Sequence, residues 1–151
     1  MTSASHRQAG SEVFHLEFDQ RHSYQSTAAD TISVPVVLRS GSSAAWLTAK
    51  IDTGASHCLF ERGHGELIGL DIEAGDRKVF STVAGQVEAF GHIVQLHALD
   101  IAVEAMVYFF ANGAITKTVL GRTGWLDRVR LGIVDYDQTL YLAHYDFDPI
   151  K

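Results

Sequence analysis

Short segments in which apolar and polar residues alternate recur along most of the chain, and turn-forming residues separate them. In residues 46–51, for example, Leu47, Ala49 and Ile51 alternate with Thr48 and Lys50. Successive residues of a β-strand point to opposite faces, so this period of two predicts a strand with one buried face. The other segments with strand character are residues 13–19, 32–38, 79–83, 86–90, 92–96, 102–110, 119–120, 130–136 and 139–144. Many short strands at intervals of about eight to twelve residues predict an all-β sandwich or barrel.

Turn residues and two irregular stretches divide these strands. Gly41 and its neighbours predict a hairpin ahead of the Trp46 strand, and Ala84-Gly85 predicts a second hairpin with Gly85 at its tip. Residues 61–70 and 121–129 lack the strand pattern, and each is predicted to form a short helix. Residues 1–11 are small and polar and are expected to be a disordered lead. Residues 12–151 are long enough to bury one core without disulfides, which predicts a single domain.

Composition and charge argue against several classes of partner. The formal net charge is −6 and the basic residues are not clustered, so we expect no nucleic-acid partner. No segment has the hydrophobicity of a signal peptide or a membrane span, which predicts a soluble, cytoplasmic protein. Cys58 is the only cysteine, and its place in an apolar run predicts a buried residue rather than a nucleophile. His92 and His97 have a spacing that fits no usual zinc site, so we expect no metal and no cofactor.

The strand over residues 46–51 leads directly into Asp52-Thr53-Gly54-Ala55-Ser56. The carboxylate of Asp52 is therefore expected where a strand ends and a loop begins. Thr53 and Ser56 add hydroxyl groups, and Gly54 permits a close approach of another backbone. Asp-Thr-Gly alone is a common turn tripeptide, since Asp bonds to its own backbone and Gly adopts positive φ. The surrounding apolar segments favour a site built around one acid.

This strand and loop resemble the active-site region of aspartic peptidases, in particular the retropepsin (retroviral-protease-like) family and its bacterial single-domain members. The resemblance covers roughly residues 32–142 and includes three features in the family's order. These are the Asp52-Thr53-Gly54 loop, the hairpin around Ala84-Gly85, and Val119-Leu120 followed by Gly121-Arg122. The resemblance implies a closed, barrel-like fold in which the hairpin is a flap over the substrate.

The resemblance also implies a role for each matching residue. Asp52 would be catalytic, Thr53 would hydrogen-bond to the same loop of a second subunit, and Gly54 would let the substrate backbone approach, with Ala55 and Ser56 completing the loop. Val83, Ala84, Gly85 and Gln86 would form the flap, and Val83, Val87 and Phe90 are candidates for lining the pocket or packing against the flap. Gly121 and Arg122 would pass beneath the active-site loop and support it.

Hydrolysis in this family needs two carboxylates that share a proton, one ionised and one protonated. No second Asp-Thr-Gly or Asp-Ser-Gly occurs in the chain. The resemblance therefore implies a homodimer in which Asp52 of each subunit meets the other on a two-fold axis. Strand 139–144 and the tail after it are expected to contribute to the dimer contact. The expected substrates are extended peptides with apolar side chains.

Two alternatives remain open at the level of sequence. A non-catalytic peptide-binding or dimerisation module would keep this fold without turnover. A small β-sandwich would carry Asp52 in an ordinary turn.

Overall fold

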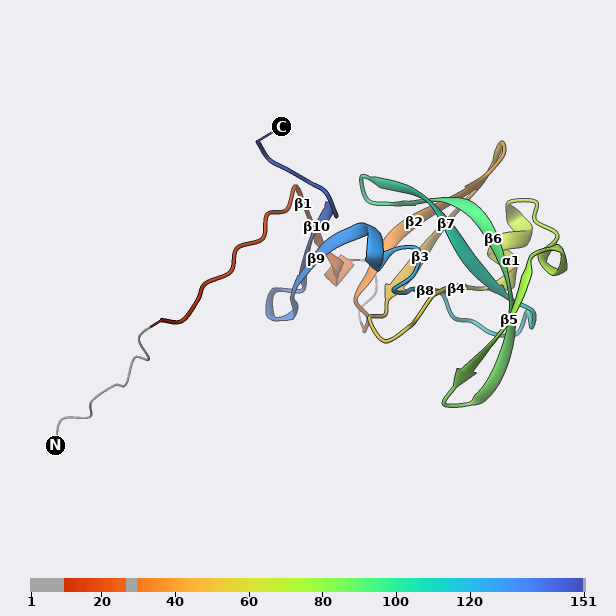
Figure 1. The fold of residues 1–151 in the computed structure, drawn as a ribbon. Coiled ribbons are helices and arrows are strands. Elements are labelled where there is room, and N and C mark those ends of the chain that lie inside the picture. Colours follow the sequence, from red (N-terminus) through yellow and green to blue (C-terminus); the bar gives the residue numbers. More distant parts are fainter. Residues whose placement is uncertain (1–9, 27–29, 151) are drawn as a thin grey trace.

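The computed structural model describes residues 10–26 and 30–150. Residues 1–9 of the predicted lead lie outside the described residues, and Gly10 and Ser11 are exposed. The described chain is mostly β, with a barrel on one side and a small three-stranded sheet on the other (Figure 1).

Six strands close into the barrel in the order β2, β3, β8, β4, β7, β6. Antiparallel pairing of Val36–Arg39 in β2 with Gln95–Ala98 in β6 closes the circle. The predicted barrel is thus confirmed, and the alternative of a sandwich is wrong. The strand bounds are β2 Ser33–Ser40, β3 Ser43–Ile51, β4 Cys58–Phe60, β6 Gly85–Ala98, β7 Ile101–Phe110 and β8 Val119–Leu120.

β5, Asp76–Thr82, lies outside the closed circle. It pairs only with the first half of β6, from Gly85 to Gly91, among the described residues. The β5–β6 hairpin therefore extends from the barrel as a two-stranded ribbon (Figure 1).

The small sheet joins the two ends of the described chain. Its strands are β1 Gln20–Ser23, β10 Thr139–His144 and β9 Val129–Val134, with β10 in the middle. Leu140 and Leu142 are fully buried in the same core cluster as Trp125 and the barrel side chains. Both edges of β10 are paired within the chain. The contribution of this strand and of the tail after it to a dimer contact stays a prediction.

The helical elements are short. They are α1 Arg62–Leu67 and four 3₁₀ turns, η1 Tyr24–Ser26, η2 Ile72–Ala74, η3 Leu126–Arg128 and η4 Asp135–Asp137. The helix predicted within residues 61–70 is confirmed as α1. The one predicted over residues 121–129 is reduced to η3, because the amides of Arg122 and Thr123 donate to the Asp52 loop instead.

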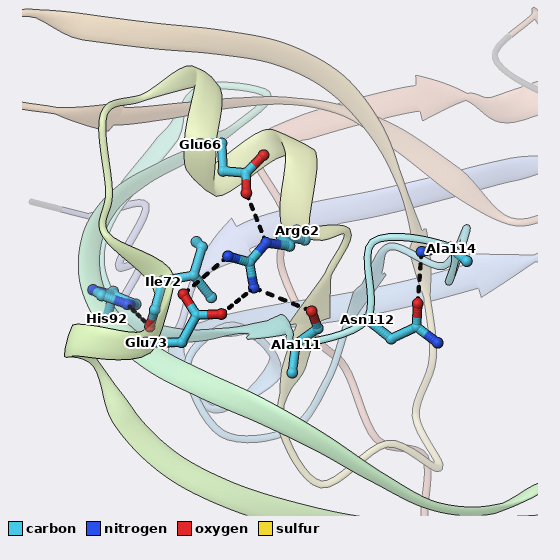
Figure 2. Close-up of polar contacts among 8 residues, drawn as sticks. All are labelled: Arg62, Glu66, Ile72, Glu73, His92, Ala111, Asn112 and Ala114. Atoms are coloured by element: carbon cyan, nitrogen blue, oxygen red, sulfur yellow. Dashed lines mark hydrogen bonds and ion pairs between the residues drawn. The ribbon is translucent and has the colours of Figure 1, made fainter.

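Arg62 fixes α1 to the adjoining segments (Figure 2). Its guanidinium donates to Glu66 at 2.6 Å, to both carboxylate oxygens of Glu73 at 2.5 and 2.9 Å, and to the carbonyl of Ala111 at 3.1 Å. Nearby, a ring nitrogen of His92 lies 2.9 Å from the carbonyl oxygen of Ile72. These contacts connect α1, η2 and the end of β7 on the side of the barrel away from the small sheet.

The strand predicted over residues 13–19 is not present. Phe14 and Leu16 are 80% and 67% exposed, and only Phe18 packs on the small sheet, against Tyr141. An alternating pattern forms a strand only when it pairs with a neighbouring strand, and among the described residues this segment pairs with none. The first strand, β1, begins at Gln20.

The segments predicted as separate strands over residues 86–90 and 92–96 form the single strand β6. Gly91 does not end the strand, because it allows close packing. A Cβ at Gly91 would lie 2.7 Å from Sδ of Met106 and 2.9 Å from the Tyr108 ring. One strand therefore runs from the hairpin tip into the barrel wall.

Candidate active site

The Asp52 side chain is held at the end of β3 by backbone contacts. The Asp52 amide donates to the carbonyl of Leu120 at 3.0 Å, which ties the start of the loop to β8. The Gly54 amide donates to Oδ1 of Asp52 at 3.0 Å, and the Ala55 amide donates to the Asp52 carbonyl at 3.2 Å. The carboxylate is partly exposed. Its orientation is thus fixed by the tight turn that Asp-Thr-Gly forms.

Gly121 and Arg122 support the loop from behind through the main chain. The Arg122 amide donates to the Ala55 carbonyl at 2.8 Å, and the Thr123 amide donates to the Ser56 carbonyl at 2.9 Å. A Cβ at Gly121 would lie only 2.1 Å from the carbonyl oxygen of His57. Two backbones meet here without room for a side chain, so this position requires glycine.

A pocket of about 370 Å³ lies between the Asp52 loop and strand β5 of the hairpin. It is lined by Asp52, Gly54, Ala55, Ser56, Leu59, Phe80, Ser81, Thr82, Val83 and Lys117. Asp52 is the only carboxylate among these lining residues. The pocket therefore contains one acid, one ammonium group, and walls that are partly apolar.

The predicted site residues divide into two groups. Asp52, Gly54, Ala55, Ser56 and Val83 all line this pocket. The others are not in its lining: Thr53 is exposed in the loop, Ala84, Gly85 and Gln86 are exposed at the hairpin tip, and Gly121 and Arg122 lie behind the loop.

The hairpin tip differs from the prediction by one residue. Thr82 pairs with Gly85, so Val83 and Ala84 form the two-residue tip and Gly85, with φ of +113°, begins β6. The Thr82 hydroxyl donates to the Gly85 carbonyl at 2.8 Å and accepts from the Ala84 amide at 3.2 Å. Neither tip residue has positive φ, so the turn is not the type I′ form.

An apolar layer lies under the hairpin, apart from the main core. Its buried members are Leu59, Phe80, Ala89, Phe110 and Val119, and Val87 packs against them as predicted. Phe90, predicted to pack behind the flap, belongs instead to the main core. Leu59 and Phe80 are shared between this layer and the Asp52 pocket, so the layer forms part of the pocket wall.

His57 connects the Asp52 loop to the base of the hairpin. Its ring makes edge contacts with Phe80 and Tyr108, with centroids 5.5 and 5.3 Å away, and Nδ1 is 2.8 Å from the Ser56 hydroxyl. Burial, reinforced by the charge of Lys78, lowers the pKa of His57. This environment therefore favours the neutral imidazole over its charged form.

Sequence reasoning missed several residues of the pocket. Phe80, Ser81 and Thr82 lie in the segment 79–83, which the pattern predicts only as a strand, and Leu59 lies in the apolar run that contains Cys58. Lys117 comes from a loop more than 60 residues after Asp52. The alternation in residues 79–83 was the one available signal, since it indicates that Ser81 and Val83 share a face.

Cys58 is fully buried beside this site, as predicted. Burial raises the pKa of its thiol to about 12, so the thiol is not a nucleophile at neutral pH. Among residues 10–26 and 30–150, no group of three or more His, Cys, Asp or Glu side chains is placed to hold a metal ion. In the same residues, no helix has both the length and the apolar character needed to cross a membrane.

A comparison with models of known protein families finds no match, and a comparison with curated proteins finds none either. Among solved structures, the chain is similar to the EIAV protease complexed with the inhibitor HBY-793. The sequence identity is 20% and the TM-score is 0.47, with 60% of this chain and 80% of that chain covered.

Proposed function

We propose that the chain is an aspartic endopeptidase that acts as a homodimer, with Asp52 of each subunit forming one shared active site. The observation that carries the proposal is the Asp52 pocket. A carboxylate oriented by the Gly54 amide faces the hairpin strand β5, and no other carboxylate lines the pocket. Two-carboxylate chemistry at this position therefore calls for a second copy of the chain.

In the proposed reaction, the two Asp52 carboxyl groups share one proton. The ionised carboxylate takes a proton from water as the water oxygen attacks the carbonyl carbon of the peptide bond. The protonated carboxyl transfers its proton to the carbonyl oxygen, which becomes a hydroxyl in the tetrahedral intermediate. The carboxyl that took the proton from water then passes it to the amide nitrogen. The C–N bond breaks, the hydroxyl returns a proton to the other carboxylate, and an acid and an amine are released.

The loop and the hairpin have separate parts in this proposal. Thr53 is exposed beside Asp52, and in the proposed dimer it hydrogen-bonds across the two-fold axis. Gly54 lets the substrate backbone approach the carboxylate, while Ala55 and Ser56 form the pocket wall. The end of the hairpin, residues 83–86, acts as a flap that closes over the substrate and excludes water. Gly121 and Arg122 hold the loop in place.

The proposed substrates are peptides in extended conformation. The space between the loop and the hairpin is bounded by a strand, to which an extended backbone can hydrogen-bond. Leu59, Phe80 and Val83 supply apolar contacts to one side of that peptide. We further propose that residues 12–151 act as one domain, because the small sheet and the barrel share a core.

The test is cleavage of a mixed library of fluorogenic peptides by the wild-type chain and by Asp52→Asn. Asp100→Asn is the matched control, because this exposed residue lies in the β6–β7 turn. Cleavage that survives in Asp100→Asn and disappears in Asp52→Asn supports the proposal. Equal cleavage by both variants contradicts it. If the wild-type chain binds peptides but cleaves none, the peptidase proposal is contradicted and the chain is the non-catalytic peptide-binding module.

A further inference from the structure

A second pocket, of about 430 Å³, adjoins the Asp52 pocket and carries positive charge. Its lining includes Lys50, Lys117 and five serine or threonine side chains, with Glu61 as the only carboxylate. Lys117 lines both pockets, so the two lie next to each other at this residue. We call this second cavity the lysine pocket.

The two lysines are brought together by the pairing of β3 with β8. Lys50 lies two residues before Asp52, and its amide donates to the Thr118 carbonyl at 3.0 Å, next to Lys117. In the parallel register, Lys50 is opposite Val119, a member of the apolar layer under the hairpin. Lys50 therefore lies on the hairpin side of the barrel wall. Within the described residues, neither lysine is found in an ion pair.

Glu61 offsets only part of this charge. Its carboxylate lies 3.9 Å from Nε2 of His64 on α1, and its amide donates to the Thr118 hydroxyl at 3.4 Å. With Glu61 included, the lining still carries one net positive charge, from two lysines and one glutamate.

Ser33 provides an independent indication that a ligand belongs here. It lines the lysine pocket, is 1% exposed, and its hydroxyl has no hydrogen-bond partner among the described residues. A buried hydroxyl without a partner is unfavourable by about 1–3 kcal/mol. An anion in the pocket accepts hydrogen bonds from the ammonium donors, and also from the Ser33 hydroxyl once that hydroxyl turns toward it.

We propose that the lysine pocket is a subsite for the carboxylate of a Glu or Asp side chain of the substrate peptide. This inference rests on the proposed peptidase function and adds a charge preference to it. A peptide is favoured over a free anion because Lys117 joins the pocket to the one that contains Asp52. Alternate side chains of an extended peptide point to opposite sides, so one can enter the lysine pocket while its neighbour contacts the apolar wall.

The test uses pairs of non-cleavable peptides with a hydroxyl-bearing isostere in place of the scissile bond. The two members of a pair differ only by Glu or Gln at one position near the isostere, and titration calorimetry measures their affinities. For the wild-type chain we expect one position at which Glu binds about fivefold more tightly than Gln. In the Lys50→Gln/Lys117→Gln double variant the ratio should fall to about one, because the charge that selects Glu is gone.

The matched control removes two positive charges elsewhere, as Arg21→Gln/Arg39→Gln, and both arginines are exposed. This variant should keep the Glu preference. A preference lost equally in the arginine variant would reflect overall charge and would overturn the subsite. Binding of isostere peptides by the wild-type chain with no preference for Glu would also overturn the subsite, but it would leave the peptidase proposal intact.

A second measurement does not depend on catalysis. In the Asp52→Asn chain, NMR signals of the Lys50 and Lys117 side chains are followed while the Glu and Gln peptides are added. Shifts with the Glu peptide alone support the subsite. An absence of shifts overturns it whether or not the wild-type chain cleaves peptides. Shifts with inorganic phosphate but with neither peptide would identify a small-anion site and also overturn it.

Discussion

Substitution of Gly121 by alanine should destabilise the protein and disorder the candidate site, although it adds only one methyl group. The ideal Cβ would lie 2.1 Å from the carbonyl oxygen of His57, 2.5 Å from its carbonyl carbon and 2.9 Å from the carbonyl oxygen of Ala55. All three are backbone atoms, so no side chain can rotate away. Overpacking in a well-packed core costs about 1–3 kcal/mol. We expect about 3 kcal/mol here, because the backbone itself must move.

The assay is urea denaturation together with the thermal midpoint. For a chain of this size, 1 kcal/mol corresponds to roughly 2–4 °C, so the melting temperature should fall by about 6–12 °C. Gly63→Ala is the matched control: a Cβ there meets nothing within 4 Å, and Gly63 lies inside α1. Alanine in a helix is favoured over glycine by about 0.5–1 kcal/mol, so this variant should be slightly more stable. A Gly121→Ala chain as stable as wild type would refute the close approach.

Three further predictions concern the surroundings of the site. Arg62→Gln should reduce stability at pH 7, and the difference from wild type should shrink in urea titrations as the pH falls below about 4. The reason is that hydrogen bonds from Arg62 lower the pKa of Glu73 in the folded chain. The stabilisation from this pair is therefore complete above the pKa that Glu73 has in the unfolded chain, and it is lost as acid protonates the carboxylate of the folded chain. Cys58 should react with a thiol reagent only after unfolding, and rapid labelling of the native chain would contradict its burial. The wild-type chain should lose stability as the pH falls below about 6.5, because the pKa of His57 is lowered on folding and its protonation therefore favours the unfolded chain. The His57→Phe chain has no such group and should lose less. Identical pH dependence of both chains would contradict this.

The sequence pattern was sufficient for most of the barrel. Residues 46–51 and 102–110 alternate cleanly, and both form strands with the expected faces buried. The pattern gave the wrong result where the formation of a strand depends on pairing with another strand. Phe14 and Leu16 alternate equally well but find no edge within the described chain, and Gly91 resembles a break although it allows β6 to pass close to Tyr108. Pairing and close approach are properties of the folded chain rather than of local spacing.

The same distinction applies to the candidate site. The geometry of the Asp52 turn follows from local chemistry, since Asp and Gly bond within three residues. Lys117 and Phe80 reach the pocket only because β8 and β5 are placed beside the loop by long-range pairing. Their proximity could not be read from the sequence. The apolar and basic walls that would select a substrate were therefore missed, whereas the acid was found.

The central claim is that two copies of Asp52 share one active site, and subunit mixing tests it most directly. Wild-type and Asp52→Asn chains are mixed in equal amounts, allowed to exchange subunits, and assayed at constant total concentration on a cleaved peptide. If both carboxyl groups are required, only dimers of two wild-type subunits are active, and random pairing leaves about a quarter of the wild-type rate. If each chain contains a complete site of its own, half of the rate would remain, and the shared site would be contradicted.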